Sequence, residues 1–356
     1  MQKQKLQPVE ILGLYQKPVR ESFISQLKTP VFPEEFAIPD RFKSEEQFHW
    51  EMVRDYPMRQ SKYLRPTLIL LVAESMEKNI EMALPTAVAM QASEEWILIH
   101  DDFEDNSLLR RGLPALHRKY PFELAVNAGD YLHITMWEFL RQNISLLGTE
   151  TADKVYKEFF TMLSRTALGQ TVEIRWTLDN KMDLDDEDWF FVCDGKTGYY
   201  TIAGPMRLGA IISGATQTQL EAITKFGILL GRCFQLVDDT LDLTGDFSGK
   251  KQPMNDLYEG KRTLILGHLL RSVNPEEREK IKSILMKSRN EKTESDISFL
   301  YDSVVKYGSI EYAKKMAVDL RDKALVMLDT DLAFLSHEPA RSYLRELTNF
   351  IVDRKY

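Results

Sequence analysis

The chain has 356 residues, of which 44% are hydrophobic, and carries a formal net charge of −8. This length allows a sizeable core in one large domain or two ordinary ones, and the excess of acids argues against a nucleic-acid-binding surface, which needs clustered Lys and Arg. With Cys193 and Cys233 as the only cysteines, neither a disulfide framework nor a zinc site is indicated.

The N-terminal part gives no targeting signal. Residues 1–20 mix Lys, Gln and Pro with isolated apolar residues and lack the apolar stretch of a secretory signal. The most apolar stretch, Leu68–Ala73, is far too short to span a bilayer. We therefore expect a cytoplasmic protein without a transmembrane segment, with a peripheral segment over residues 1–40 and a single all-helical domain over residues 41–356.

Helix signals recur along the chain, whereas strand signals are weak. Ser44 with Gln47 forms a candidate capping box, and Asn274 before Pro275 is typical of a helix N-terminus. From Ser309 onward, apolar residues return at three- and four-residue steps, as they do on one face of a helix. The sequence therefore predicts an all-α fold.

One acidic pattern, Asp-Asp-x-x-Asp, occurs twice, far apart in the sequence. Its members are Asp101, Asp102 and Asp105 in the first cluster, and Asp238, Asp239 and Asp242 in the second. Residues four apart on a helix share a face, and each cluster follows an apolar stretch, so the acids should project into an enclosed space. Buried carboxylates are costly without a partner, and oxygen ligands suit Mg²⁺. The alternative is two solvated helix faces, which the apolar flanks disfavour.

Basic residues accompany these clusters. They are Lys62, Arg65, Arg110, Arg111, Lys196, Lys250, Lys251 and Lys261. Any one of them alone is more often a surface residue than a ligand, but arginine suits bidentate phosphate recognition and lysine adds a compact charge. Metal-bridged acids beside such cations indicate a diphosphate site, where the leaving group is stabilised as a carbon–oxygen bond breaks. The resulting allylic cation needs a dry, apolar pocket.

These motifs, in this order, resemble the trans-isoprenyl diphosphate synthases of the polyprenyl synthetase family. The similarity runs from about Lys62 to Ala324 and includes His100-Asp101-Asp102, Arg110-Arg111-Gly112, Gly169-Gln170, Lys196-Thr197, Phe234-Gln235 and Glu259-Gly260-Lys261. The resemblance implies a bundle of long helices around a central cavity and usually a homodimer. It implies a short-chain prenyltransferase that condenses isopentenyl diphosphate with an allylic diphosphate.

Carried over position by position, the resemblance assigns roles to the site residues. It implies that Asp101 and Asp105 bind two Mg²⁺ ions, and that Asp238, with Asp242 as a further candidate, binds a third. The allylic diphosphate would contact Arg110, Lys196 and Lys261, and isopentenyl diphosphate would contact Lys62, Arg65 and Arg111. Thr197 and Gln235 would lie beside the developing cation.

The sequence departs from the family pattern near the expected isopentenyl site. Glu94 stands where the family commonly has His or Gln, an unusual neighbour for an anionic substrate, and Tyr63 stands where a basic residue is usual. The loop before Asp256 is one residue longer, so both Lys250 and Lys251 are candidate phosphate ligands. The metal motifs are unchanged.

In this family the residues four and five places before the first Asp close the end of the pocket; here they are Ile97 and Trp96. A large indole there should block long chains, which predicts geranylgeranyl diphosphate as the product, with farnesyl diphosphate close behind. Alternatively, Trp96 only fills a helix interface. Two other functions are weighed: a class I terpene cyclase or head-to-head synthase, and a non-catalytic regulatory subunit of a prenyltransferase. The complete second acidic cluster argues against both.

Overall fold

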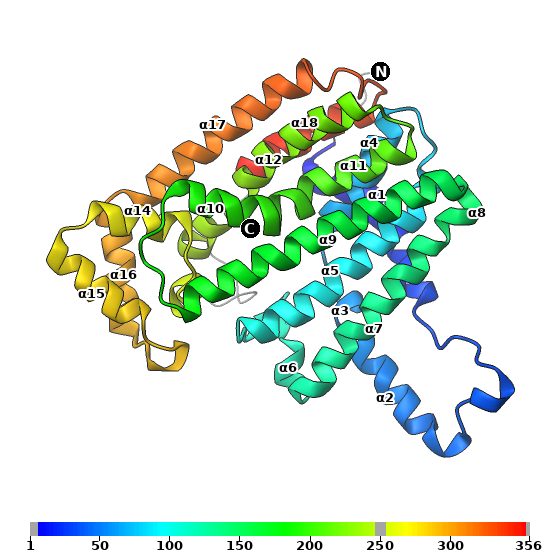
Figure 1. Cartoon of the computed structure of the whole chain (residues 1–356), viewed down its shortest axis with the longest axis horizontal. Helices are drawn as coiled ribbons and strands as arrows, with labels where there is room; N and C mark the ends of the chain where they lie inside the picture. The colour runs from blue at the N-terminus through cyan, green and yellow to red at the C-terminus, as the bar shows by residue number, and fades with distance from the viewer. Residues whose placement is uncertain (1–5, 246–253, 354–356) are drawn as a thin grey trace.

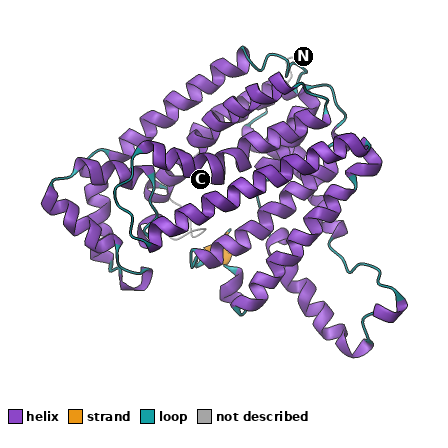
Figure 2. Ribbon diagram, viewed as in Figure 1, coloured by secondary structure: helices purple, strands orange, loops and turns teal. Residues whose placement is uncertain are grey.

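The computed structural model describes residues 6–245 and 254–353, and most of this part is helical (Figure 2). The first half contains α1 (Pro8–Gln26), η1 (Glu34–Phe36), η2 (Asp40–Phe42), α2 (Lys43–Val53), α3 (Asp55–Met58), α4 (Leu64–Ser75), η3 (Ile80–Met82), α5 (Leu84–Glu104), α6 (Leu116–Lys119), α7 (Phe122–Arg141), α8 (Asn143–Leu147) and α9 (Thr149–Leu178). The strands β1 (Leu109–Arg110) and β2 (Leu113–Pro114) pair antiparallel, with Arg110 opposite Leu113.

The described residues of the second half contain helices and connecting loops but no strand. It contains α10 (Asp186–Cys193), the π-helix η4 (Asp194–Ala203), α11 (Gly204–Ile212), α12 (Gln217–Thr244), α13 (Asn255–Glu259), α14 (Leu264–Ser272), α15 (Pro275–Leu285), η5 (Arg289–Glu291), α16 (Glu294–Lys306), α17 (Ser309–Asp329) and α18 (Ala340–Asp353). No helix in residues 6–245 and 254–353 combines the length and apolar character needed to cross a membrane.

The long helices run side by side and share one continuous apolar core (Figure 1). Helix α5 packs against α4 and α7, α12 packs against η4 and α17, and α9 packs against η4 and α11. Helices α14, α15 and α16 form a smaller group at one end of the molecule. Because α5 and α12 each end in an acidic cluster, this packing decides whether the two clusters meet.

The N-terminal forty residues divide into two parts. Ile11, Val19 and Phe23 of α1 are fully buried, and the helix packs against α4, α5 and α18. The prediction of a peripheral segment therefore does not hold for α1. Residues 28–42 contain no buried side chain, and Val31 is 99% exposed.

Two helix starts test the local sequence signals. Asn274 Oδ1 accepts a hydrogen bond from the backbone N–H of Glu277 at 2.9 Å, and Pro275 is the first residue of α15, as predicted. The capping box at Ser44 is wrong: α2 begins at Lys43, and the Ser44 hydroxyl donates to Glu45 instead.

The π-helix η4 lies unusually close to two long helices because glycines face it. A Cβ atom on Gly231 of α12 would lie 2.3 Å from Cα of Gly198, and one on Gly169 of α9 would lie 2.8 Å from the backbone N of Lys196. Only glycine permits such approaches. They hold Lys196 and Thr197 between α9 and α12, and π-helical turns are frequent at functional sites.

Candidate active site

A cavity of about 490 Å³ lies among α5, α9, η4 and α12. Both acidic clusters border it, although they are far apart in the sequence. Asp101 and Asp105 come from the C-terminal end of α5, and Asp238, Asp239 and Asp242 come from the C-terminal end of α12. The two helices therefore bring their acids to one shared space.

Acids outnumber bases in the wall of this cavity. The described acids that line it are Asp101, Glu104, Asp105, Glu173, Asp238, Asp239, Asp242 and Asp256, and the bases are Arg65, Arg110, Lys196, Lys261 and Arg262. Mutual repulsion among buried carboxylates is costly without further positive charge. This imbalance fits a site that takes up cations.

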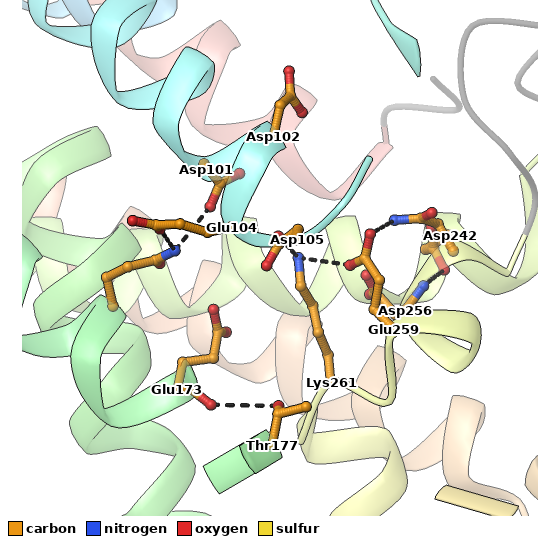
Figure 3. Close-up of polar contacts among 12 residues, drawn as sticks. Asp101, Asp102, Glu104, Asp105, Glu173, Thr177, Asp242, Asp256, Glu259 and Lys261 are labelled. Atoms are coloured by element: carbon orange, nitrogen blue, oxygen red, sulfur yellow. Dashed lines mark hydrogen bonds and ion pairs between the residues drawn. The ribbon is translucent and has the colours of Figure 1, made fainter. Parts of the chain in front are cut away.

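Lys261 lies among carboxylates (Figure 3). Its Nζ is 2.6 Å from Asp105 Oδ2 and 3.1 Å from Glu259 Oε2. Burial alone would lower the pKa of Lys261, but these neighbouring acids raise it well above its ordinary value. Burial raises the pKa of Asp105 to about 7, although the charge of Lys261 opposes this rise. Lys261 therefore stays positively charged at neutral pH.

Lys196 occupies the other side of the first cluster. Its Nζ lies 3.4 Å from Asp101 Oδ1 and forms an ion pair with Glu173 of α9. Gln170, one turn before Glu173, donates from Nε2 to Glu104 at 2.7 Å. Burial alone would raise the pKa of Asp101, but the positive charges of Lys196, Lys261 and Arg110 together lower it. Asp101 is thus held as a carboxylate.

Asp102 points away from Asp101 and Asp105 (Figure 3) and lies outside the wall of the cavity. Its side chain is fully buried, and it accepts hydrogen bonds from Arg110 Nε at 2.9 Å and from the Tyr56 hydroxyl at 2.5 Å. Arg110 itself borders the cavity. In this arrangement the carboxylate of Asp102 holds the guanidinium of Arg110 in place.

Two acids of the second cluster, Asp239 and Asp242, accept hydrogen bonds from neighbouring residues. Gln235 Nε2 donates to Asp239 Oδ1 at 2.7 Å, while Asp239 Oδ2 is buried and has no hydrogen-bond partner among the described residues. Burial raises the pKa of Asp239 to about 7, opposed by this hydrogen bond. Asp242 Oδ2 accepts from the backbone N–H of Asp256 at 2.9 Å, which ties the single turn of α13 to α12.

The residues expected to bind isopentenyl diphosphate include two arginines that already pair with acids. Arg65 Nη1 lies 3.2 Å from Glu94 Oε1, and Arg111 Nη1 lies 2.9 Å from the buried Glu95. Arg111 Nη2 is also 3.7 Å from Glu94. Of these four side chains only Arg65 borders the cavity. The carboxylate of Glu94 therefore occupies the position beside Arg65 that an anionic ligand would seek.

Residues 47–304 match the family model described as polyprenyl synthetase. The chain belongs to the polyprenyl synthetase family. It is 29% identical over 295 residues to a geranylgeranyl diphosphate synthase of Saccharolobus solfataricus, an alignment that covers 83% of this chain and 86% of the relative. It is 30% identical over 313 residues to a geranylfarnesyl diphosphate synthase of Natronomonas pharaonis, with the same coverage.

A solved structure leads to the same conclusion. The crystal structure of geranylgeranyl pyrophosphate synthetase from Pyrococcus horikoshii Ot3 matches with a TM-score of 0.82 at 26% identity, over 97% of this chain and 98% of that chain. The predicted family, the all-helical fold class and the enzyme class of isoprenyl diphosphate synthase are thereby confirmed.

Most of the predicted site residues of this polyprenyl synthetase border one cavity. Besides the acids and bases already described, these are Trp96, Ile97, Thr197 and Gln235. Asp102, Glu94, Arg111 and Lys62 lie outside its wall. Lys250 and Lys251 lie outside the described residues. The individual roles of all these residues stay predictions.

Some residues in the wall received no role from the sequence. Gln170 and Glu173 lie nearly one turn apart on α9 and both border the cavity, as do Asp256 and Arg262. The spacing of Gln170 and Glu173 was a usable signal, because residues three apart share a helix face. Arg262 gave no such signal, since its place depends on the turn at Gly260.

The site residues fit a hard divalent cation. Among the described residues no three acids lie close enough together to hold a metal ion as they stand, and the ammonium groups of Lys196 and Lys261 neutralise Asp101 and Asp105 instead. The donors are all carboxylate oxygens, which Mg²⁺ prefers, and Mg²⁺ takes few protein ligands and completes its shell with phosphate oxygens and water. The excess of acids and the unpartnered Asp239 Oδ2 support this fit.

Proposed function

We propose that this chain is a magnesium-dependent trans-prenyltransferase that condenses isopentenyl diphosphate with an allylic diphosphate and releases diphosphate. The observation that carries the proposal is the meeting of the two acidic clusters at one cavity, together with Arg110, Lys196 and Lys261. Members of the polyprenyl synthetase family take these two substrates and use Mg²⁺.

The charged part of the cavity would hold the allylic diphosphate. We propose that Asp101 and Asp105, with Asp238, Asp239 and Asp242, bind Mg²⁺, up to three ions, which supplies Lewis-acid stabilisation of the leaving diphosphate. Arg110, Lys196 and Lys261 donate hydrogen bonds to its oxygens as negative charge builds on them. In this proposal Asp102 binds no metal and orients Arg110 instead, since it faces away from the cavity.

The apolar part of the cavity would hold the hydrocarbon chain. Trp96, Ile97, Leu163 and Ala167 border it there, and such side chains exclude water from an allylic cation. We propose geranylgeranyl diphosphate as the product, because Trp96 limits the depth of the pocket and because relatives bear that name. Farnesyl diphosphate is the second candidate. Thr197 and Gln235 lie between the charged and apolar parts in this proposal.

The proposal is tested by incubating the pure chain with labelled isopentenyl diphosphate and Mg²⁺, with either dimethylallyl diphosphate or farnesyl diphosphate as primer. We expect label in a longer prenyl diphosphate and none when EDTA removes the metal. A hydrocarbon product would indicate a terpene cyclase or a head-to-head synthase. An absence of product from a folded, magnesium-loaded chain would indicate a regulatory subunit. Both alternatives are disfavoured because both acidic clusters are complete and border the same cavity.

We also propose a cytoplasmic homodimer. Ile134, Ile144, Tyr156, Phe160 and Leu168 lie on α7, α8 and α9, and each is 49–66% exposed. Apolar surface of this kind is typical of a protein–protein interface. Light scattering coupled to size-exclusion chromatography measures the mass directly, and a mass of 41.3 kDa would contradict the dimer.

A further inference from the structure

A column of aromatic rings connects the cavity wall to the outside of the bundle. Trp96 borders the cavity, and its ring lies 4.7 Å from that of His133 on α7, centroid to centroid, at an interplanar angle of 31°. Trp137, one turn further along α7, donates its indole N–H to His133 Nε2 at 3.0 Å. The ring of Trp137 in turn lies 4.8 Å from that of Tyr156.

Trp96 depends on its ring contacts for its orientation. Its indole Nε1 is buried and has no hydrogen-bond partner among the described residues. The rings that contact it are those of His133 and of His100, whose centroid lies 5.6 Å away in an edge-on arrangement. Ring contacts orient a side chain less strictly than a hydrogen bond does. His133 is therefore one of the two ring neighbours that orient Trp96.

The hydrogen bond from Trp137 fixes both the position and the tautomer of His133. An indole N–H can only donate, so His133 Nε2 must accept, and the proton of the neutral ring lies on Nδ1. Burial lowers the pKa of His133, which fits a neutral imidazole. The chain of fixed orientations thus runs from Trp137 through His133 to Trp96.

We propose that Trp137 is a positioning residue that sets product length: its hydrogen bond holds His133 against Trp96 and so keeps the Trp96 indole across the end of the cavity. Trp137 lies outside the wall of the cavity, so it acts through His133 and touches no substrate. This inference rests on the proposed prenyltransferase function and adds a specificity residue to it.

The test is the product distribution of Trp137→Phe with farnesyl diphosphate and excess isopentenyl diphosphate. Phenylalanine keeps an aromatic ring at this position but cannot donate to His133. We expect the fraction of products longer than the parent's main product to rise roughly three- to tenfold, as the loss of one part-buried hydrogen bond allows. His133→Asn, which cannot stack on Trp96, should shift the distribution in the same direction.

A matched control is available in α2. Trp50 also donates its indole N–H, to Thr29 Oγ1 at 2.6 Å, and lies outside the cavity wall. Trp50→Phe removes an equivalent hydrogen bond and should leave the distribution of product lengths as in the parent. A shift in this control equal to that of Trp137→Phe would overturn the proposal, because it would show a general loss of rigidity.

A double variant tests whether Trp137 acts through Trp96. Trp96→Ala alone should lengthen the products by opening the end of the cavity, and Trp137→Phe should then add nothing further. Additive shifts in the double variant would overturn the proposed route, as residues that act through one contact are not independent. Unchanged lengths in both Trp137→Phe and His133→Asn would overturn the proposal as a whole.

The hydrogen bond from Trp137 to His133 can be tested without measuring catalysis, so the result does not depend on the proposed function. Nitrogen-edited NMR of the full chain with labelled histidines, assigned by the signal lost in His133→Asn, should show His133 protonated on Nδ1. The signal should move in Trp137→Phe. Protonation on Nε2 in the parent would contradict the inference even if the chain synthesises prenyl diphosphates.

Discussion

Asp101 and Asp102 are adjacent in the sequence but face different surroundings. Asp101 borders the cavity beside Lys196, whereas Asp102 is buried between Arg110 and Tyr56. Helix geometry explains part of this, because neighbours on a helix point about 100° apart while residues four apart align. The sequence therefore predicts Asp101 and Asp105 on one face. It does not reveal that Arg110, carried by the β1–β2 hairpin, takes Asp102 as its partner.

The different surroundings predict different effects of the same substitution. Asp102→Asn removes the fully buried carboxylate that pairs with Arg110 and leaves only Asp101, 3.5 Å from its Nη2, so it should destabilise the fold by roughly 3 kcal/mol. Asp101→Asn removes one charge from an acid-rich wall, so it should change stability by about 1 kcal/mol or less and weaken Mg²⁺ binding. Urea unfolding without metal and calorimetric titration with Mg²⁺ measure the two effects. Equal stability of the two variants would contradict the structural role of Asp102.

Lys292 carries a buried ammonium group beside α13. It is 7% exposed, and its Nζ donates to the carbonyl oxygens of Leu257 at 2.9 Å and Tyr258 at 2.7 Å, at the C-terminal end of α13. Burial, together with the charges of Arg262 and Arg289, lowers the pKa of Lys292 to about 8. The ammonium group of Lys292 thus holds the turn before Lys261, although burial and the two arginines disfavour its charged form.

This shifted pKa predicts a rise of stability with pH. Between pH 8 and the ordinary pKa of 10.5, the unfolded chain binds a proton at Lys292 that the folded chain has released. The parent should therefore gain about 2 kcal/mol over Lys292→Met as pH rises through this window. Urea unfolding of both proteins at pH 7.5, 9 and 10 checks this, and a constant difference would rule out the shifted pKa.

Among the helices, the close contact of η4 with α12 helps to hold Lys196 and Thr197 at the cavity. The sequence predicts helices here from their periodicity, but a π-helix cannot be read from it, since its wider turn depends on the helices packed around it. By contrast, the sequence does predict that α15 starts after Asn274, because a capping residue acts through hydrogen bonds to residues close to it in the sequence. Helix α1 had a readable pattern in Ile11, Tyr15, Val19 and Phe23, which return every four residues and are all buried.

The glycine contact can be tested by adding a methyl group. Gly231→Ala places a Cβ atom 2.3 Å from Gly198 and should separate η4 from α12. We expect a loss of about 2–3 kcal/mol in stability and a fall in activity as Lys196 moves. Gly13→Ala in α1 is the control, because its Cβ atom would meet nothing within 4 Å. That change should stabilise the chain by about 0.5–1 kcal/mol, and thermal unfolding compares the two.

For the molecule as a whole, the two acidic clusters are useful only because α5 and α12 end beside the same cavity. Sequence spacing alone cannot show that the two clusters meet, since this depends on tertiary packing. The expectation of a central cavity came from the resemblance to a family. The same resemblance could not show that Glu94 pairs with Arg65, because Glu94 is a departure from the family pattern.

The acid-rich cavity predicts that metal and diphosphate stabilise the fold together. Inorganic diphosphate alone should raise the melting temperature little, because the wall has more acids than bases. Mg²⁺ together with diphosphate should stabilise the fold by about 2.7 kcal/mol when the concentration of the magnesium–diphosphate ligand is a hundredfold above its dissociation constant. A matrix of thermal unfolding scans over both concentrations measures this, and equal shifts with and without Mg²⁺ would contradict the proposed metal site.

The ion pair between Arg65 and Glu94 also changes what binding at that end of the cavity involves. With Glu94 in place, the guanidinium is already matched by an anion that belongs to the protein. A second diphosphate would enter by exchange, one negative partner replacing another, and not by neutralising an open positive pocket. Because Glu94 stays in the chain, its carboxylate would lose its pair with Arg65 and lie beside the added negative charge, so at this proposed site isopentenyl diphosphate should bind more tightly to Glu94→Gln than to the parent.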